Sequence, residues 1–164
     1  MKNYKIHLLV ISSLWMGMTM SVDFVAVPLV FQTLTSLQEA GKLGIAVFSK
    51  FNSIEIFLSM VLFIASILEF LKNKNGRWPM TWVLFSILLT SLAVLYAFYL
   101  SPRIAFLGNE MHQFPLESEP YLVVYKEHQF FHKLYVKLDS LKLLLLLTMI
   151  VSCWRKISKE GESK

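Results

Sequence analysis

Four long apolar segments follow one another along the chain, and short polar stretches separate them. The apolar segments are residues 6–31, 53–71, 78–100 and 134–154. A helix that crosses a bilayer needs roughly 20 mostly apolar residues, so each segment is long enough to be a membrane span. The pattern predicts an all-α integral membrane protein, a four-helix bundle formed as a single domain over residues 1–164.

The first apolar segment raises the question of a signal peptide. It follows Lys2 and Lys5 and contains one acidic residue, Asp23. A secretory signal has an apolar core of about 7 to 15 residues, which is shorter than residues 6–31. A helix of this length extends about 39 Å. We therefore expect a membrane-spanning helix here and not a cleaved signal.

The second segment has acidic residues near both of its ends. Glu55 and Glu69 are fourteen positions apart, about 21 Å along a helix and close to a whole number of turns, so they should share one helix face. Glu69 is expected to be solvated at the inner edge and paired with Lys72. Residues 40–52 are expected to form either an interfacial lead-in or an extension of the same helix.

The third segment is the most uniformly apolar part of the chain. Residues 78–100 contain no ionisable side chain except tyrosine hydroxyls, and we expect the helix to end at Pro102. Residues 102–133 are expected to form an outer loop. Its second half has an amphipathic pattern that favours a helix over residues 120–133.

Composition supports a membrane environment. Of the residues, 55% are hydrophobic and 16% are charged, whereas a soluble domain is about 45 to 50% apolar and about 25% charged. This balance argues against a large soluble enzyme, a nucleic-acid-binding protein and a disordered chain. Cys153 is the single cysteine, so no internal disulfide can form. No catalytic or nucleotide-binding motif is present, so we expect a non-enzymatic protein without a cofactor.

Basic residues predict the orientation, because cytoplasmic flanks are enriched in lysine and arginine. With four spans, one side carries most of them: Lys2, Lys5, Lys72, Lys74, Arg77, Arg155, Lys156, Lys159 and Lys164. Both termini should therefore be cytoplasmic, in a bacterial-type cytoplasmic (inner) membrane.

Four ionisable residues from three predicted helices fall at one depth, in the outer half of the bundle: Asp23, Glu55, Asp139 and Lys142. Ionisable groups inside a bilayer are costly and mark a cavity, a pathway or a buried pair. Asp139 and Lys142 can pair at i,i+3, while Asp23 and Glu55 need partners on neighbouring helices. The third helix offers other polar groups: Thr90, Ser91 and the Tyr96 hydroxyl.

Two functions remain open for this ionisable cluster. One is a proton or small-cation site open to the outer face, with the carboxylates as ligands and Lys142 as a tethered counter-charge. The other is a set of interhelical ion pairs in a structural or partner-binding accessory subunit. The bilayer is the expected partner in both cases. A homo-oligomer or a membrane protein partner is also considered, because four short helices leave little interior for a pore.

Histidines supply the third alternative, a membrane redox or metal-binding protein. His128 and His132 are spaced i,i+4, which places both imidazoles on one helix face, as two metal ligands require. Two nitrogens alone bind a metal weakly, and a closed site would need a further ligand such as His112 or Glu127. The favoured interpretation is that both histidines are ordinary polar residues on an interfacial helix.

Several sequence fragments occur in the order typical of one family. They are Trp15 with Gly17, AVPLVF at residues 26–31, EAGKLGIAVF at 39–48, SPRI at 101–104 and FHKLYVKLDSLKL at 131–143. Together they resemble the transmembrane-protein-205-like family, whose bacterial members are domains of unknown function. The resemblance implies a four-helix integral membrane protein and no known reaction. It places the following residues in the family-like fragments: Pro28, Gly41, Pro102, Arg103, His132 and Asp139.

Overall fold

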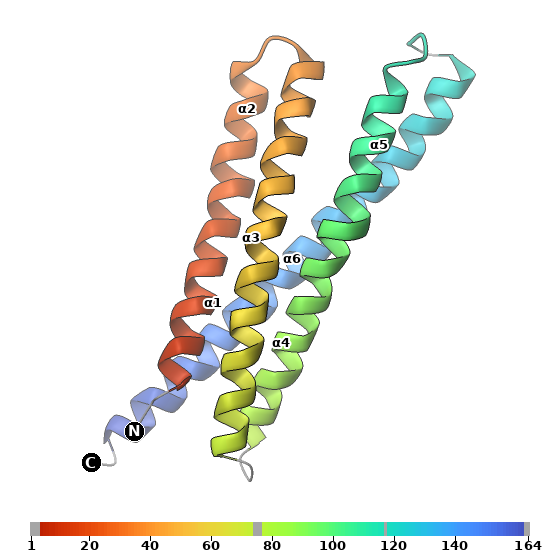
Figure 1. Ribbon diagram of the computed structural model, residues 1–164. Helices are drawn as coiled ribbons and strands as arrows, with labels where there is room; N and C mark the ends of the chain where they lie inside the picture. The colour runs from red at the N-terminus through yellow and green to blue at the C-terminus, as the bar shows by residue number, and fades with distance from the viewer. Residues whose placement is uncertain (1–3, 74–76, 117, 163–164) are drawn as a thin grey trace.

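Four long helical rods form the protein (Figure 1). The computed structural model describes residues 4–73, 77–116 and 118–162, and within these ranges it contains no strand. The first rod comprises α1 (Tyr4–Ser21), η1 (Val22–Ala26) and α2 (Val27–Thr33); the second is α3 (Leu37–Lys72); the third comprises α4 (Arg77–Leu95), η2 (Tyr96–Leu100) and α5 (Ser101–Met111); the fourth is α6 (Glu119–Glu162). The predicted all-α fold is confirmed.

Short polar residues determine where α3 and α6 begin. The Ser36 hydroxyl accepts a hydrogen bond from the backbone N–H of Glu39 at 3.4 Å, which satisfies one of the free amides at the start of α3. Ser118 accepts in the same way from Tyr121 before α6. Because α3 starts at Leu37, residues 40–52 extend the second helix and do not form a separate interfacial segment.

The expected helix end at Pro102 is wrong, and residues 102–111 are helical and not part of a loop, whereas the helix expected over residues 120–133 is present as the first part of α6. The third rod continues through α5, and α6 already starts at Glu119. Pro102 lies one residue into α5, directly after the π-helical turn η2. A π-helical turn shifts the hydrogen-bond register, so the amide that proline lacks is not required. The first rod repeats this arrangement, with η1 directly before Pro28.

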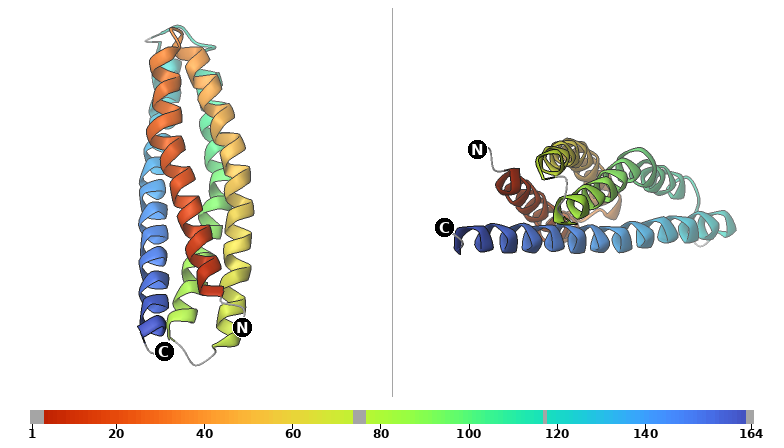
Figure 2. Two further views of the ribbon diagram at one scale, coloured as in Figure 1. Left: turned by 90° about the vertical axis from the view of Figure 1, so that its left-hand side faces the viewer. Right: turned by 90° about the horizontal axis from the view of Figure 1, so that it is seen from below.

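The rods pack as a closed ring in which each contacts two neighbours. α1 packs against α3 and α6, α4 packs against α3 and α6, and α5 continues along α6. Figures 1 and 2 show that the start of α1, the end of α3, the start of α4 and the end of α6 lie at one end of the bundle. These helix ends contain Lys5, Lys72, Arg77, Arg155, Lys156 and Lys159. Lys2, Lys74 and Lys164 lie outside the described residues, and the cytoplasmic orientation stays a prediction.

Two apolar clusters fill the interior. The larger one, toward the end with the termini, includes Leu8, Leu62, Trp82 and Leu146. The smaller one, further along the bundle, is built on Tyr96, Leu100 and Tyr135. The outward surface is also apolar, with exposed side chains such as Phe57, Phe98 and Leu144, as expected where lipid is the solvent.

Three of the rods are long and apolar enough to cross a membrane: Tyr4–Thr33, Gln38–Lys72 and Trp78–Met111. A protein with three such helices is a membrane protein. α6 is not among the three, because the charges of Asp139 and Lys142 interrupt its apolar segment and Arg155 follows it. The fourth span, residues 134–154, therefore remains a prediction.

Candidate buried carboxylate and lysine site

Lys142 lies at the centre of the polar interior. Its side chain is fully buried on the inner face of α6, and its ammonium group donates to Glu55 Oε1 of α3 at 2.6 Å. The same ammonium lies 2.5 Å from Asp139 Oδ1, one turn earlier on α6. The i,i+3 pair predicted from the spacing is therefore formed, and α3 supplies the second acidic partner.

Glu55 is held from two sides but is not fully satisfied. The indole N–H of Trp15 on α1 donates to Glu55 Oε1 at 2.8 Å, so this oxygen accepts from both Trp15 and Lys142. The other oxygen, Oε2, is buried without a hydrogen-bond partner, and the side chain has no exposed surface. A buried carboxylate oxygen without a donor is expensive, so this oxygen marks a place where a proton or another donor would be stabilised.

Asp23 joins the cluster through Asp139. It lies in η1, and its carboxyl group is close enough to that of Asp139 for the two groups to interact. An ionised carboxylate can only accept hydrogen bonds, so a bond between two carboxyl groups needs a proton on one of them. Asp23 is half-buried, whereas Asp139 is buried. The pair therefore connects the least buried acid of the cluster to its interior.

Aromatic rings enclose the ammonium group. Lys142 Nζ lies 5.1 Å from the centre of the Tyr96 ring and 5.6 Å from that of Phe51. These distances allow cation–π attraction. The centre of the Tyr135 ring lies 4.7 Å from that of the Tyr96 ring. The Tyr96 hydroxyl is itself buried without a hydrogen-bond partner.

The charges of this cluster do not balance. Three carboxyl groups, of Asp23, Glu55 and Asp139, surround the single ammonium of Lys142, so full ionisation would leave two excess negative charges in the interior. Each buried ion carries a desolvation penalty of several kcal/mol. Taking up a proton is the cheapest way to reduce this excess.

The structure brings together all four residues predicted from their common depth: Asp23, Glu55, Asp139 and Lys142. Glu55 and Lys142 have no exposed side-chain surface, whereas Asp23 is half-buried, so an opening of the site to the outer face stays a prediction. Of the groups expected from the third helix, Tyr96 lies at the cluster. Thr90 and Ser91 instead donate to backbone carbonyls, Thr90 to those of Ser86 and Ser59 and Ser91 to that of Ile87.

Sequence reasoning missed Trp15 and Thr19. Trp15, Thr19 and Asp23 are four residues apart in succession, so they lie along one stripe of the first rod. Trp15 donates to Glu55, and the Thr19 hydroxyl is buried without a partner. A tryptophan and a threonine at this spacing from a buried acid are the signal that could have identified them.

Glu69 is not solvated, contrary to expectation. It is fully buried near the other end of the bundle, where Nδ2 of Asn73 donates to its Oε1 at 2.6 Å and Lys5 Nζ lies 3.8 Å away. Glu55 and Glu69 do share one buried face of α3, as their spacing predicts. A second polar interior therefore exists, about 21 Å from the first along the helix.

The two candidate metal-ligating histidines lie on one face of α6, with stacked rings 6.2 Å apart. Burial lowers the pKa of His128 below its ordinary value of 6.5, and the neighbouring His132 adds to this effect. Within the described residues, no group of three or more histidine, cysteine or acidic side chains is arranged to hold a metal ion. His128 and His132 therefore have no third ligand among those residues.

Comparison with known proteins shows the family. Residues 10–113 match a family described as a domain of unknown function, DUF4149. This match covers α2, α3, α4 and α5 completely and most of α1. No curated protein and no solved structure matches the chain significantly. Because the match extends over more than half of its length, the chain belongs to the DUF4149 family of domains of unknown function.

Proposed function

We propose that this membrane protein takes up and releases a proton at the cluster of Asp23, Glu55, Asp139 and Lys142. The observation that carries the proposal is the buried Oε2 atom of Glu55, which has no hydrogen-bond partner while three acids surround one ammonium group. A proton relieves both problems, because it removes a negative charge and supplies a donor.

A proton fits this site better than a metal cation does. The ammonium of Lys142 already occupies the position between Glu55 and Asp139 that a bound cation would take. A monovalent metal ion would have to displace a tethered positive charge from both carboxylates. A proton needs no such displacement, because it can bind to an oxygen that Lys142 leaves free.

The route of the proton follows the gradient of burial. Asp23 is the half-buried acid and interacts with Asp139, which contacts Lys142. A proton that enters at Asp23 and passes to Asp139 weakens the attraction between Asp139 and Lys142. Lys142 is then held mainly by Glu55, so proton uptake shifts the ammonium group away from Asp139 and toward Glu55.

The membrane arrangement is part of the proposal. α6 crosses the bilayer as the fourth span, both termini are cytoplasmic, and the membrane is of the bacterial cytoplasmic type. The basic residues gathered at the end with the termini support this orientation. The likeness of the sequence fragments to the transmembrane-protein-205-like family supports the four-span arrangement. A homo-oligomer or another membrane protein as partner is compatible with the apolar outer surface.

Infrared spectroscopy of the protein in lipid bilayers tests the proposal, because protonated and ionised carboxyl groups absorb at different frequencies. We expect a protonated carboxyl signal at neutral pH that titrates at higher pH. D23N and D139N should each remove it. E119Q, which alters an exposed acid in the first turn of α6, is the matched control and should leave the signal unchanged.

The structural alternative is favoured by one observation, the contact of Lys142 with acids of two helices. In that case the cluster only fixes the order of the helices. The titrating signal would then be absent from the wild-type protein, and D139N would change stability alone. An identical titration in D139N, E119Q and wild type would exclude the cluster as the proton site.

A further inference from the structure

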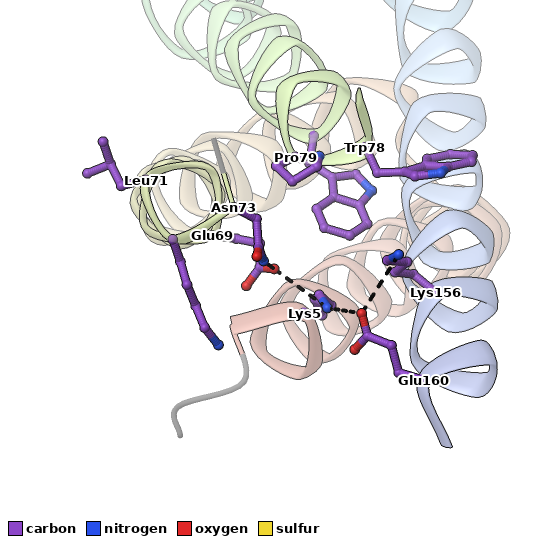
Figure 3. Close-up of a pocket in the computed structure, with 10 residues that line it drawn as sticks. Lys5, Glu69, Leu71, Asn73, Trp78, Pro79, Lys156 and Glu160 are labelled. Atoms are coloured by element: carbon purple, nitrogen blue, oxygen red, sulfur yellow. Dashed lines mark hydrogen bonds and ion pairs between the residues drawn. The ribbon is translucent and has the colours of Figure 1, made fainter. Parts of the chain in front are cut away.

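A second polar site lies at the end of the bundle that carries the termini, where a pocket of about 530 Å³ opens between α1, α3, α4 and α6 (Figure 3). Pockets that bind small molecules have volumes of about 300 to 1,000 Å³. Glu69 and Lys5 line its interior, Trp78 and Lys72 line it near the connection from α3 to α4, and Lys156 and Glu160 line it on α6.

One carboxylate oxygen in the interior of this pocket has no hydrogen-bond partner. Glu69 has no exposed surface, and its Oε2 atom is buried without a partner. Its Oε1 atom accepts from Asn73 at 2.6 Å, and the ammonium of Lys5 lies 3.8 Å from Oε1, beyond hydrogen-bond distance. A ligand that brings a positively charged N–H donor would satisfy Glu69 Oε2.

The rim of the pocket has a different character from its floor. Lys5 forms an ion pair with Glu160, and Lys156 Nζ lies 3.8 Å from the same carboxylate. Lys156 and Glu160 retain about two fifths of their side-chain exposure. Lys72 is exposed on the opposite side of the pocket. The pocket therefore presents an acceptor at its base and positive charge near its opening.

The location of the pocket indicates where such a ligand comes from. Trp78 and Leu71 line it and are exposed, at 49% and 54%. Tryptophan is enriched at the boundary between hydrocarbon and headgroups, and this end of the bundle also carries most of the basic residues. Both features are typical of the depth at which phospholipid headgroups lie.

We propose that this pocket binds the headgroup of phosphatidylethanolamine. The primary ammonium of the lipid donates to Glu69 Oε2, and its phosphate lies near Lys156. An anionic lipid such as phosphatidylglycerol offers Glu69 only neutral hydroxyl donors. Phosphatidylcholine has the same net charge as phosphatidylethanolamine but no N–H donor, so the two lipids distinguish a hydrogen bond from charge attraction alone.

Native mass spectrometry of the detergent-purified protein with each lipid added in turn measures this selectivity. We expect phosphatidylethanolamine to bind about tenfold more tightly than phosphatidylcholine, the factor expected for one hydrogen bond to a charged group. Phosphatidylglycerol should also bind more weakly. Equal binding of the first two lipids, or no binding of any lipid, would overturn the proposal, and this series requires no variant to fold.

Two variants test the residues. E69Q should reduce binding of phosphatidylethanolamine to the level of phosphatidylcholine, and K156A should weaken binding of both lipids. The matched control is K159A, which alters an exposed lysine of the same helix that does not line the pocket. Unchanged selectivity in E69Q would overturn the role of Glu69. Soluble glycerophosphoethanolamine that binds as tightly as the lipid would overturn the assignment to a membrane lipid.

Discussion

Glu55 Oε1 and Lys142 Nζ lie 2.6 Å apart although 87 positions separate the two residues in the chain. Their helices, α3 and α6, are not packing neighbours in the part of the chain that the structure describes, since α1 and α4 each lie between them. The ion pair therefore connects opposite corners of the ring through its interior. The contact between α3 and α6 is therefore made by long side chains, because the two helix backbones do not pack against each other.

Replacing Lys142 with methionine should be strongly destabilising. K142M leaves Glu55 and Asp139 buried without a counter-charge, and breaking a buried ion pair on one side costs about 3 to 5 kcal/mol. The free energy of unfolding, measured by denaturation in mixed micelles, should fall by about that amount. The double variant E55Q/K142M should recover part of the loss, because it removes one of the uncompensated charges.

The control for this experiment is K137M, which alters an exposed lysine on the same helix. K137M should change the free energy of unfolding by less than about 0.5 kcal/mol, as is usual for surface positions. A loss in K142M no larger than that in K137M would contradict the presence of a buried charge cluster.

The indole of Trp15 should contribute more than that of Trp82. Both tryptophans are fully buried and both donate an N–H hydrogen bond of 2.8 Å, but Trp15 donates to the carboxylate of Glu55 and Trp82 to the neutral hydroxyl of Ser152. A hydrogen bond to a charged group is worth about 1.5 to 3 kcal/mol and a neutral one about 0.5 to 1.5 kcal/mol. W15F should therefore destabilise the protein by about 1 kcal/mol more than W82F.

These two variants control for each other, because the same change in ring size occurs in both. Thermal unfolding of the two proteins in one detergent gives the comparison. If W82F were the less stable of the two, Glu55 would not be the charged acceptor that the contact with Lys142 requires.

Hydropathy predicted the four rods but not their lengths. Hydropathy reports which side chains avoid water, so the segments over residues 53–71 and 78–100 correspond to the C-terminal half of α3 and to the N-terminal part of the third rod. The extension through Pro102 could not be predicted, because it depends on the π-helical turn η2 that accommodates the proline. A π-helical turn does not produce a characteristic spacing of apolar residues, so it cannot be recognised from hydropathy.

The candidate site was predictable only in part, for a related reason. Depth along each helix was enough to select Asp23, Glu55 and Lys142, since charges in apolar segments are rare and stand out. Trp15, the partner of Glu55, has a mostly apolar side chain, so hydropathy alone does not distinguish it from a residue that faces lipid. The full burial of Glu69 likewise depends on Lys5 and Asn73, which approach it only in the folded bundle.

Acid should destabilise the outer part of α6 through His128. Because burial lowers the pKa of His128 in the folded protein, the unfolded chain binds more protons just below its ordinary pKa of about 6.5. The stabilisation is therefore complete above pH 6.5 and decreases as the pH falls through that value toward the lower folded pKa. The unfolding midpoint of H128Q, measured from pH 5 to 8, should depend less on pH than that of wild type.

The matched variant is H132Q, because His132 is exposed one turn later on the same helix face. H132Q should retain most of the dependence on pH. Equal pH profiles in H128Q and wild type would show that other groups, such as the carboxylates around Lys142, cause the acid sensitivity.

Whether α6 crosses the bilayer can be decided by labelling single cysteines from one side of the membrane. In a C153S background, Q32C lies in the last turn of the first rod, Q113C lies between α5 and α6, and K159C lies near the end of α6; all three positions are exposed. If α6 spans the membrane, a membrane-impermeant maleimide added to intact cells should label Q32C and Q113C but not K159C. Inverted vesicles should give the opposite pattern. Labelling of Q113C and K159C from the same side would mean that α6 lies along the surface, and the charged interior would then face the membrane boundary and not its core.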